Sequence, residues 1–289
     1  MRTEVEMLDL IVSTAKTDDR IRAVIMNGSR VNPNAPKDIF QDFDIVYFVT
    51  HVESFTSDHS WIDRFGEMLI QQMPETMKAP APVCDGRFSY LMQFTDGNRI
   101  DLTLFPIRSL SDLRGDSLSR LLLDKDGAVG HIPEPTDRDY IPEPPTAKAF
   151  FDCCNEFWWV CPYVAKGLWR EEIIYAKYML DQIVRSQLMI MLNWYLGAQT
   201  QVSVNPGNHG KYLKKYLEPE LWSMLEKTYS NARYDDTWDA LFIMCDLFRR
   251  SAKRVAVHFG FEYLQRDDDK VTAHLKHIQA LPKDAMEIY

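Results

Sequence analysis

The stretch that decides the fold is VIMNGSRVNPNAPKDIFQDFDIVYFV, residues 24–49. It places two carboxylates, Asp42 and Asp44, at the start of an apolar run, although strands normally avoid aspartate. Because side chains alternate along a strand, both acids point to the same face, roughly 7 Å apart. Two carboxylates this close repel each other, and a bound cation offsets that repulsion. The stretch therefore predicts a metal site on a strand.

A third acid and a turn complete the predicted site. Asp101 lies in the strand-like run RIDLTLF, residues 99–105, where the apolar neighbours take the opposite face. Carboxylates on neighbouring strands can hold two Mg²⁺ ions, which clamp the attacking and leaving oxygens of a phosphoryl transfer. The turn GSR offers Gly28 for close backbone approach, the Ser29 hydroxyl with backbone N–H groups for phosphate oxygens, and Arg30 for bidentate pairing with phosphate.

The pattern of apolar residues divides the chain into two parts. Residues 3–17 and 60–73 are predicted to be helical, IRAVIM and DFDIVYFV to be strands, and the runs around Asp96-Gly97 to form a hairpin. A proline-rich stretch at 131–145 reads as a linker, and beyond it helices are predicted at 147–168, 171–197, 217–230 and 235–258. We therefore expect an α+β domain with a small mixed sheet over residues 1–135, followed by an all-helical domain over 146–289.

The order of strand, GS turn, DxD strand and later acid resembles the nucleotidyltransferase superfamily, with its polymerase β-like fold. The segments FQDFDIVYFVT, DGNRIDLTL, LLLDKDG, FDCCNEFWWV and GKYLKKYL narrow the resemblance to the aminoglycoside 6-adenylyltransferases, which modify streptomycin. This resemblance implies ATP as co-substrate, Mg²⁺ as cofactor, and transfer of AMP to a hydroxyl of streptomycin, the 6-hydroxyl, with release of pyrophosphate. Composition and spacing alone predict metal-assisted phosphoryl transfer and no more.

One face of the helix predicted at 147–168 is a candidate substrate surface, formed by Asp152, Glu156, Trp159, Tyr163 and Lys166. Acids pair with a guanidinium and aromatic rings stack on it, so the face suits a guanidinium-bearing sugar. We assign Lys166 to the binding of the nucleotide. The alternative interpretation is an ordinary half-exposed helix. The general base that takes the proton of the acceptor hydroxyl is either Asp101 or Glu156.

Bulk composition narrows the class of protein. Of 289 residues 46% are hydrophobic, and 33 basic against 42 acidic side chains give a net charge of −9. This balance argues against nucleic-acid binding, including an RNA-tailing polymerase, and suits a cationic substrate. We expect a cytoplasmic monomer or weak oligomer without a membrane span or signal peptide, in which Cys153, Cys154 and Cys161 are buried free thiols. Two alternative functions stay open: nucleotidyl transfer to another small molecule or a macromolecule, and nucleotide binding without catalysis.

Overall fold

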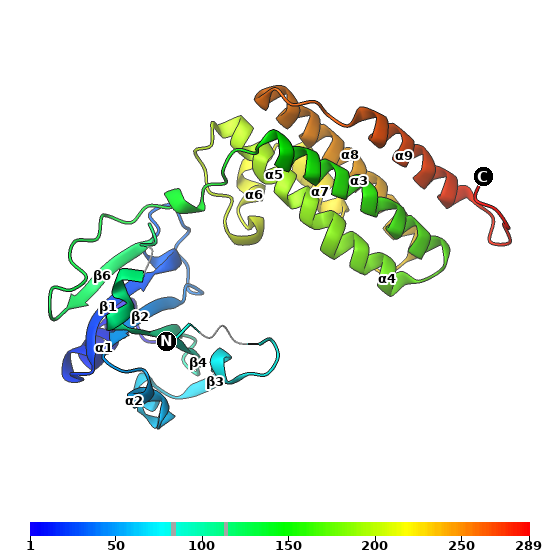
Figure 1. Cartoon of the computed structure of the whole chain (residues 1–289). Coiled ribbons are helices and arrows are strands. Elements are labelled where there is room, and N and C mark those ends of the chain that lie inside the picture. Colours follow the sequence, from blue (N-terminus) through cyan, green and yellow to red (C-terminus); the bar gives the residue numbers. More distant parts are fainter. Residues whose placement is uncertain (82–84, 113–114) are drawn as a thin grey trace. The chain divides into compact units, whose positions relative to one another are not determined.

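The computed structural model of this chain describes residues 1–81, 85–112 and 115–289, and it divides into two compact units, Met1–Asp139 and Tyr140–Tyr289 (Figure 1). The first unit contains a mixed β-sheet with helix α1 beside it, and the second unit is built from helices. The predicted α+β class with a helical C-terminal part is thereby confirmed. Within the described ranges, no helix has the length and apolar character needed to cross a membrane.

The sheet of the first unit has the strand order β3-β4-β5-β2-β1-β6. Strands β2 and β5 are parallel, and the other neighbouring pairs are antiparallel. The strands are β1 (Ile21–Asn27), β2 (Phe43–Val49), β3 (Met68–Gln72), β4 (Phe88–Phe94), β5 (Arg99–Pro106) and β6 (Ser119–Asp124). Because β2 and β5 run in the same direction, the acids near their first residues meet at one end of the sheet.

The two faces of this sheet have different coverings. Helix α1 (Glu4–Thr17) begins at a capping box between Thr3 and Glu6, and it packs Met7 and Ile11 into the larger core on one face. The hydroxyl of Tyr47 donates to the Ile11 carbonyl at 2.6 Å, which ties helix to strand. The opposite face carries a smaller apolar cluster built on Ala23, Ile25, Phe48 and Phe105. By strand alternation Asp44 and Asp101 lie on this second face.

The structure corrects the prediction of a helix over residues 60–73. A 3-10 helix, His59–Phe65, ends at Gly66, whose φ of 128° is unfavourable for other residues, and the chain then enters the edge strand β3. Backbone hydrogen bonds to β4 stabilise β3 as a strand. A local pattern of apolar residues does not reveal a pairing partner that lies elsewhere in the sequence. Strand β6 and helix α9 (Gln265–Ala280) are further elements that the sequence pattern did not predict.

The second unit packs its helices around one large core. The predicted helix at 147–168 is α3 (Ala147–Trp169), capped by Thr146, and the helix predicted at 171–197 is a continuous run whose middle turns are π-helical. The remaining helical bounds are α4 (Ile173–Tyr178), the π-helix Met179–Val184, α5 (Arg185–Thr200), α6 (Leu213–Tyr216), α7 (Pro219–Lys227) and α8 (Tyr234–Phe259). Cys153, Cys154 and Cys161 are buried free thiols as predicted, whereas Cys84 lies outside the described residues.

Candidate active site

Three aspartates meet on the second face of the sheet, at the end where β2 and β5 begin. Asp44 and Asp101 are direct neighbours in the parallel register of these strands, and Asp42 immediately precedes β2. One carboxylate oxygen from each of the three residues lies within 4.8 Å of the other two. The structure thus brings together the three acids for which the sequence predicted a metal site.

Gly28 is the residue that makes room for this cluster. It follows β1 with φ of 77°, and a Cβ added to it would lie 2.0 Å from Oδ2 of Asp44. Its N–H donates to the Leu118 carbonyl at 3.2 Å, so this amide holds the turn against the segment leading into β6. Gly28 therefore contributes to the site by letting Asp44 lie close to the turn. Its N–H is occupied by the hydrogen bond to the Leu118 carbonyl.

The remaining residues of the turn fix the start of β2. Arg30 donates to the carbonyls of Gln41 at 2.6 Å and Asp42 at 3.0 Å, and its guanidinium lies 3.7 Å from the centre of the Phe43 ring. The Gln41 side chain donates in return to the Ser29 carbonyl at 3.1 Å. These contacts lock the GSR turn to the residues before Asp42, and burial lowers the pKa of Arg30. Phosphate binding by Ser29 or Arg30 stays a prediction.

The carboxylates repel each other strongly. Burial, together with the charges of Asp42 and Asp101, raises the pKa of Asp44 to about 7. Arg99 is the nearest compensating cation and donates bidentately to Asp101, with both N–O distances at 2.7 Å, while its Nε lies 4.0 Å from Asp42. Sequence reasoning missed Arg99, although its spacing of two residues from Asp101 on one strand was a readable signal.

This donor set fits a magnesium ion. Mg²⁺ prefers oxygen ligands at about 2.0–2.1 Å, so two ligands of one ion lie at most about 4.2 Å apart. The three carboxylate oxygens all lie within 4.8 Å of one another. The absence of a side chain at Gly28 lets the Asp44 carboxylate lie against the turn, and a cation would offset the charges of Asp42 and Asp101, which together with burial raise the pKa of Asp44. Asp42, Asp44 and Asp101 are therefore the residues that would hold divalent metal, and metal-assisted phosphoryl transfer is chemistry that this arrangement can perform.

The candidate substrate face lies on α3 in the second unit. Asp152, Glu156, Trp159 and Lys166 are exposed and Tyr163 is half-buried, so the predicted face is solvent-accessible. The rings of Trp159 and Tyr163 meet edge to face at 6.4 Å, and Nζ of Lys166 lies 4.9 Å from the centre of the Tyr163 ring. Asp152 is paired with Lys148 one turn earlier. Along α3 the two acids thus precede the aromatic pair, and Lys166 follows it.

Helix α9 completes a shallow cavity of about 440 Å³ beside this row. Trp159, Pro162 and Tyr163 line it from α3, and Asp267 and Lys270 from α9. Sequence reasoning missed this contribution because α9 was not predicted. The structure groups these residues within the second unit and the three aspartates within the first. Their assignment to substrate and nucleotide stays a prediction.

Comparison with known proteins gives consistent matches over nearly the whole chain. The family model of streptomycin adenylyltransferase matches residues 1–278. An aminoglycoside 6-adenylyltransferase from Bacillus subtilis is 43% identical over 270 residues, covering 93% of this chain and 95% of the relative. Similar enzymes from Campylobacter jejuni and Staphylococcus aureus are 44% and 37% identical, over 93% and 91% of this chain and 93% and 94% of theirs. A crystal structure of an aminoglycoside 6-adenyltransferase from Bacillus subtilis shares 38% identity, with coverage of 97% of this chain and all of the other, and a TM-score of 0.49.

Proposed function

The chain belongs to the streptomycin adenylyltransferase family and is an adenylyltransferase that acts on an aminoglycoside, and from that premise we propose that it moves AMP from MgATP to the 6-hydroxyl of streptomycin, with release of pyrophosphate. The observation that carries the proposal is the cluster of Asp42, Asp44 and Asp101, in which the lack of a side chain at Gly28 lets Asp44 lie against the turn. Such a protein confers resistance to the antibiotic.

The proposed reaction has a simple balance of bonds. The acceptor hydroxyl oxygen attacks the α-phosphorus of ATP, the bond from this phosphorus to the bridging oxygen breaks, and pyrophosphate leaves. Asp42, Asp44 and Asp101 would hold divalent metal, two ions in our proposal, which would supply charge neutralisation for the phosphoryl transfer. The hydroxyl proton passes to a carboxylate, either Asp101 or Glu156.

Two observations bear on the choice of base. Asp101 is held by Arg99 through both of its oxygens, and it is also a proposed metal ligand, so its lone pairs have other partners. Glu156 is exposed on the α3 face, beside the aromatic pair that we propose for the antibiotic. These contacts therefore favour Glu156 over Asp101 as the general base. Streptomycin carries guanidinium groups, for which Glu156 and Asp152 offer carboxylates and Trp159 offers an exposed ring.

Mass spectrometry of the antibiotic tests the proposal directly. Streptomycin incubated with the protein and MgATP should gain one AMP, and pyrophosphate should appear in equal amount. The same assay with other aminoglycosides identifies the acceptor, and replacement of ATP by GTP or CTP identifies the donor. An AMP adduct on a different aminoglycoside would redirect the proposal to that acceptor. No adduct with any of them would contradict it.

A cytoplasmic location is part of this proposal. ATP is the donor, and cysteines that persist as free thiols are typical of the reducing cytoplasm. The described cysteines, Cys153, Cys154, Cys161 and Cys245, are all free, and the sulfurs of the last two lie 3.9 Å apart without forming a disulfide. Fractionation of cells that express the protein would test the location.

A further inference from the structure

The loop between the GSR turn and β2 exposes two adjacent large apolar side chains. Ile39 is 68% exposed and Phe40 is 87% exposed, so the Phe40 ring lies almost wholly in water. Single exposed apolar residues are common on protein surfaces, so the meaning of this pair depends on where the loop places it. Two features of the loop, its anchoring and its position beside the acid cluster, give the Phe40 ring a use.

The main chain on both sides of the Phe40 ring is held in place. The N–H of Phe40 donates to Oδ1 of Asp38 at 2.8 Å. On the other side, Arg30 donates to the Gln41 carbonyl at 2.6 Å, and the Gln41 side chain donates to the Ser29 carbonyl at 3.1 Å. A side chain with two rotatable bonds on a fixed main chain loses little conformational entropy when a ligand covers it. The ring is therefore well suited to contact a ligand.

Phe40 lies immediately beside the acid cluster. It is two residues before Asp42, so the two main-chain positions are at most about 7 Å apart. Transfer requires the reacting oxygen of the acceptor to come within about 3–3.5 Å of the phosphorus that it attacks. An aminoglycoside consists of several linked rings and extends well beyond this distance. The part of the acceptor next to its reacting hydroxyl therefore lies against residues that flank the cluster, and Phe40 is one of them.

The charges around the ring favour a cationic ligand. Asp38 and Asp42 stand two residues before and after the ring, and both side chains reach solvent. Lys37 is exposed, so residues 37–42 carry one positive and two negative charges. The charge of Arg30 is engaged by main-chain carbonyls. An ammonium or guanidinium can lie over the ring with a carboxylate within reach, whereas the negative face of an aromatic ring disfavours an anion.

We propose that Phe40 is a specificity-determining residue for the acceptor, whose exposed ring stacks on a cationic group of the aminoglycoside while the reacting hydroxyl lies at the acid cluster. The inference rests on the proposed function, since it takes the transfer to occur at Asp42, Asp44 and Asp101. Aminoglycosides as a class carry ammonium or guanidinium groups, so the contact does not depend on streptomycin alone. The first unit thereby contributes to recognition of the acceptor, in addition to the face of α3.

A matched set of variants tests the contact by affinity. Phe40→Leu keeps an apolar side chain and removes the ring, and Tyr178→Leu removes a ring that is 56% exposed on α4. Phe40→Leu should weaken streptomycin binding about fivefold or more and change MgATP affinity less than about twofold. Phe40→Trp should retain or exceed the wild-type affinity, because tryptophan is the strongest aromatic partner of a cation. Tyr178→Leu should change neither affinity.

Calorimetry measures these constants without turnover. Streptomycin is titrated into each protein with Mg²⁺ and the α,β-methylene analogue of ATP, which cannot release pyrophosphate, and the analogue is titrated separately. Unchanged streptomycin affinity in Phe40→Leu would overturn the inference. Loss of affinity for the ATP analogue alone would assign the ring to the donor, and equal losses for both ligands would indicate a general effect on the loop; either result contradicts the proposal.

Fluorinated phenylalanine at position 40 separates stacking on a cation from simple apolar contact. Fluorine withdraws electron density from the face of the ring with little change of shape, so streptomycin affinity should fall stepwise from one to three fluorine atoms. The same series at position 178 should leave the affinity unchanged. A constant affinity along the series at position 40, with Phe40→Leu still impaired, would rule out the cation contact.

The outcomes separate this inference from the proposed function. A wild type that adenylylates streptomycin, with Phe40→Leu binding it equally well, would leave the proposed function and remove the inference. A wild type that modifies a different aminoglycoside moves the same titrations to that compound, with the same expected losses. Selective loss of aminoglycoside affinity along both series would support the contact even if the wild type transferred no AMP. A wild type that bound no aminoglycoside would overturn both.

Discussion

At the scale of single residues, the site depends on carboxylates that are held together against their repulsion. Arg30 holds the backbone before Asp42, Arg99 pairs with Asp101, and Gly28 allows Asp44 to lie against the turn. Burial, together with the charges of Asp42 and Asp101, raises the pKa of Asp44. Two predictions follow from this arrangement at the residue scale.

Asp44→Asn should abolish transfer and stabilise the metal-free protein at pH 8. Burial and the two neighbouring acids raise the pKa of Asp44 from 3.8 to about 7. In the wild type this group therefore costs stability progressively as pH rises from about 4 to 7, and the full cost remains above pH 7. Each pKa unit is worth about 1.4 kcal/mol, so the variant should gain a few kcal/mol at pH 8 and much less at pH 5.

Urea denaturation with EDTA at both pH values, and again with Mg²⁺, measures this effect. Mg²⁺ should stabilise the wild type at pH 8 and stabilise the variant much less. A variant that was less stable than the wild type at pH 8 would show that Asp44 makes a favourable structural contact instead. Retained turnover with Mg²⁺ would show that Asp44 is not a ligand.

Gly28→Ala should reduce turnover about a hundredfold, because a misplacement of about 1 Å at a catalytic group costs that much. The added Cβ would lie 2.0 Å from Asp44 Oδ2 and displace the carboxylate. Gly97→Ala is the matched control, since Gly97 also has positive φ, 89°, but has no atom within 4 Å of the added Cβ. Both variants pay the backbone cost of about 1–2 kcal/mol, and only Gly28→Ala should lose activity. Similar turnover in the two would rule out the close approach as a catalytic requirement.

At the scale of elements, the parallel pairing of β2 with β5 places the acids, and the solvent-exposed row on α3 is the surface that we propose for the antibiotic. The register sets Asp44 opposite Asp101, and the spacing of the row along α3 puts Glu156 beside the Trp159–Tyr163 pair. A test at this scale therefore substitutes a residue of α3 and measures the affinity for MgATP, the substrate that we do not assign to this helix.

Glu156→Gln should lower kcat for streptomycin by about 100-fold or more, the usual contribution of a general base, while MgATP affinity changes less than about twofold. The conservative change keeps the size and removes the charge. Glu226→Gln, at an exposed position of α7, is a control for charge loss in the same unit. Calorimetry for ATP and steady-state kinetics for the antibiotic separate the two effects. A parallel collapse of ATP affinity would move Glu156 to the nucleotide site or to a structural role.

At the scale of the whole molecule, the net charge of −9 favours a cationic acceptor. We expect kcat/KM for streptomycin to fall about tenfold or more between low and high salt, because screening shortens the Debye length to about 8 Å at physiological ionic strength. kcat should change little, and MgATP, itself anionic, should respond weakly or in the opposite sense. Steady-state kinetics across a salt series measures this. A flat kcat/KM would leave recognition of the antibiotic to shape and aromatic stacking.

The sequence by itself determined which face of the first unit carries the acids. The alternation of Asp42, Phe43 and Asp44 is a local property of an extended chain, and the period-2 rule is enough to place both acids on one side. The helix over residues 3–17, the Asp96-Gly97 hairpin and the solvent-exposed row on α3 likewise follow from short-range patterns, and the structure contains each of them.

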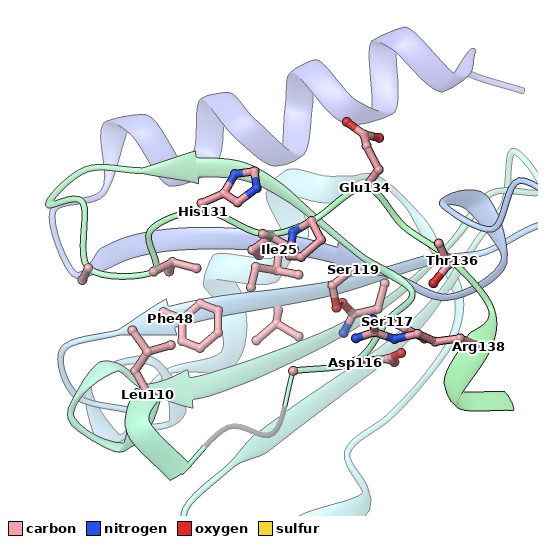
Figure 2. A pocket seen from close by; sticks show the side chains of 17 residues that line it. Ile25, Phe48, Leu110, Asp116, Ser117, Ser119, His131, Glu134, Thr136 and Arg138 are labelled. Atoms are coloured by element: carbon pink, nitrogen blue, oxygen red, sulfur yellow. Dashed lines mark hydrogen bonds between the residues drawn. The ribbon is translucent and has the colours of Figure 1, made fainter.

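Only the tertiary structure decided the features that depend on pairing between distant segments. β3 became an edge strand because β4 satisfies its backbone, Asp101 was placed beside Asp44 by the β2–β5 register, and Gly28 proved to be packed against Asp44. The cavity shown in Figure 2 arises where β1, β2 and residues 128–138 come together. Local patterns record the preferences of neighbouring residues, whereas these contacts follow from the burial of a shared face, which no single segment encodes.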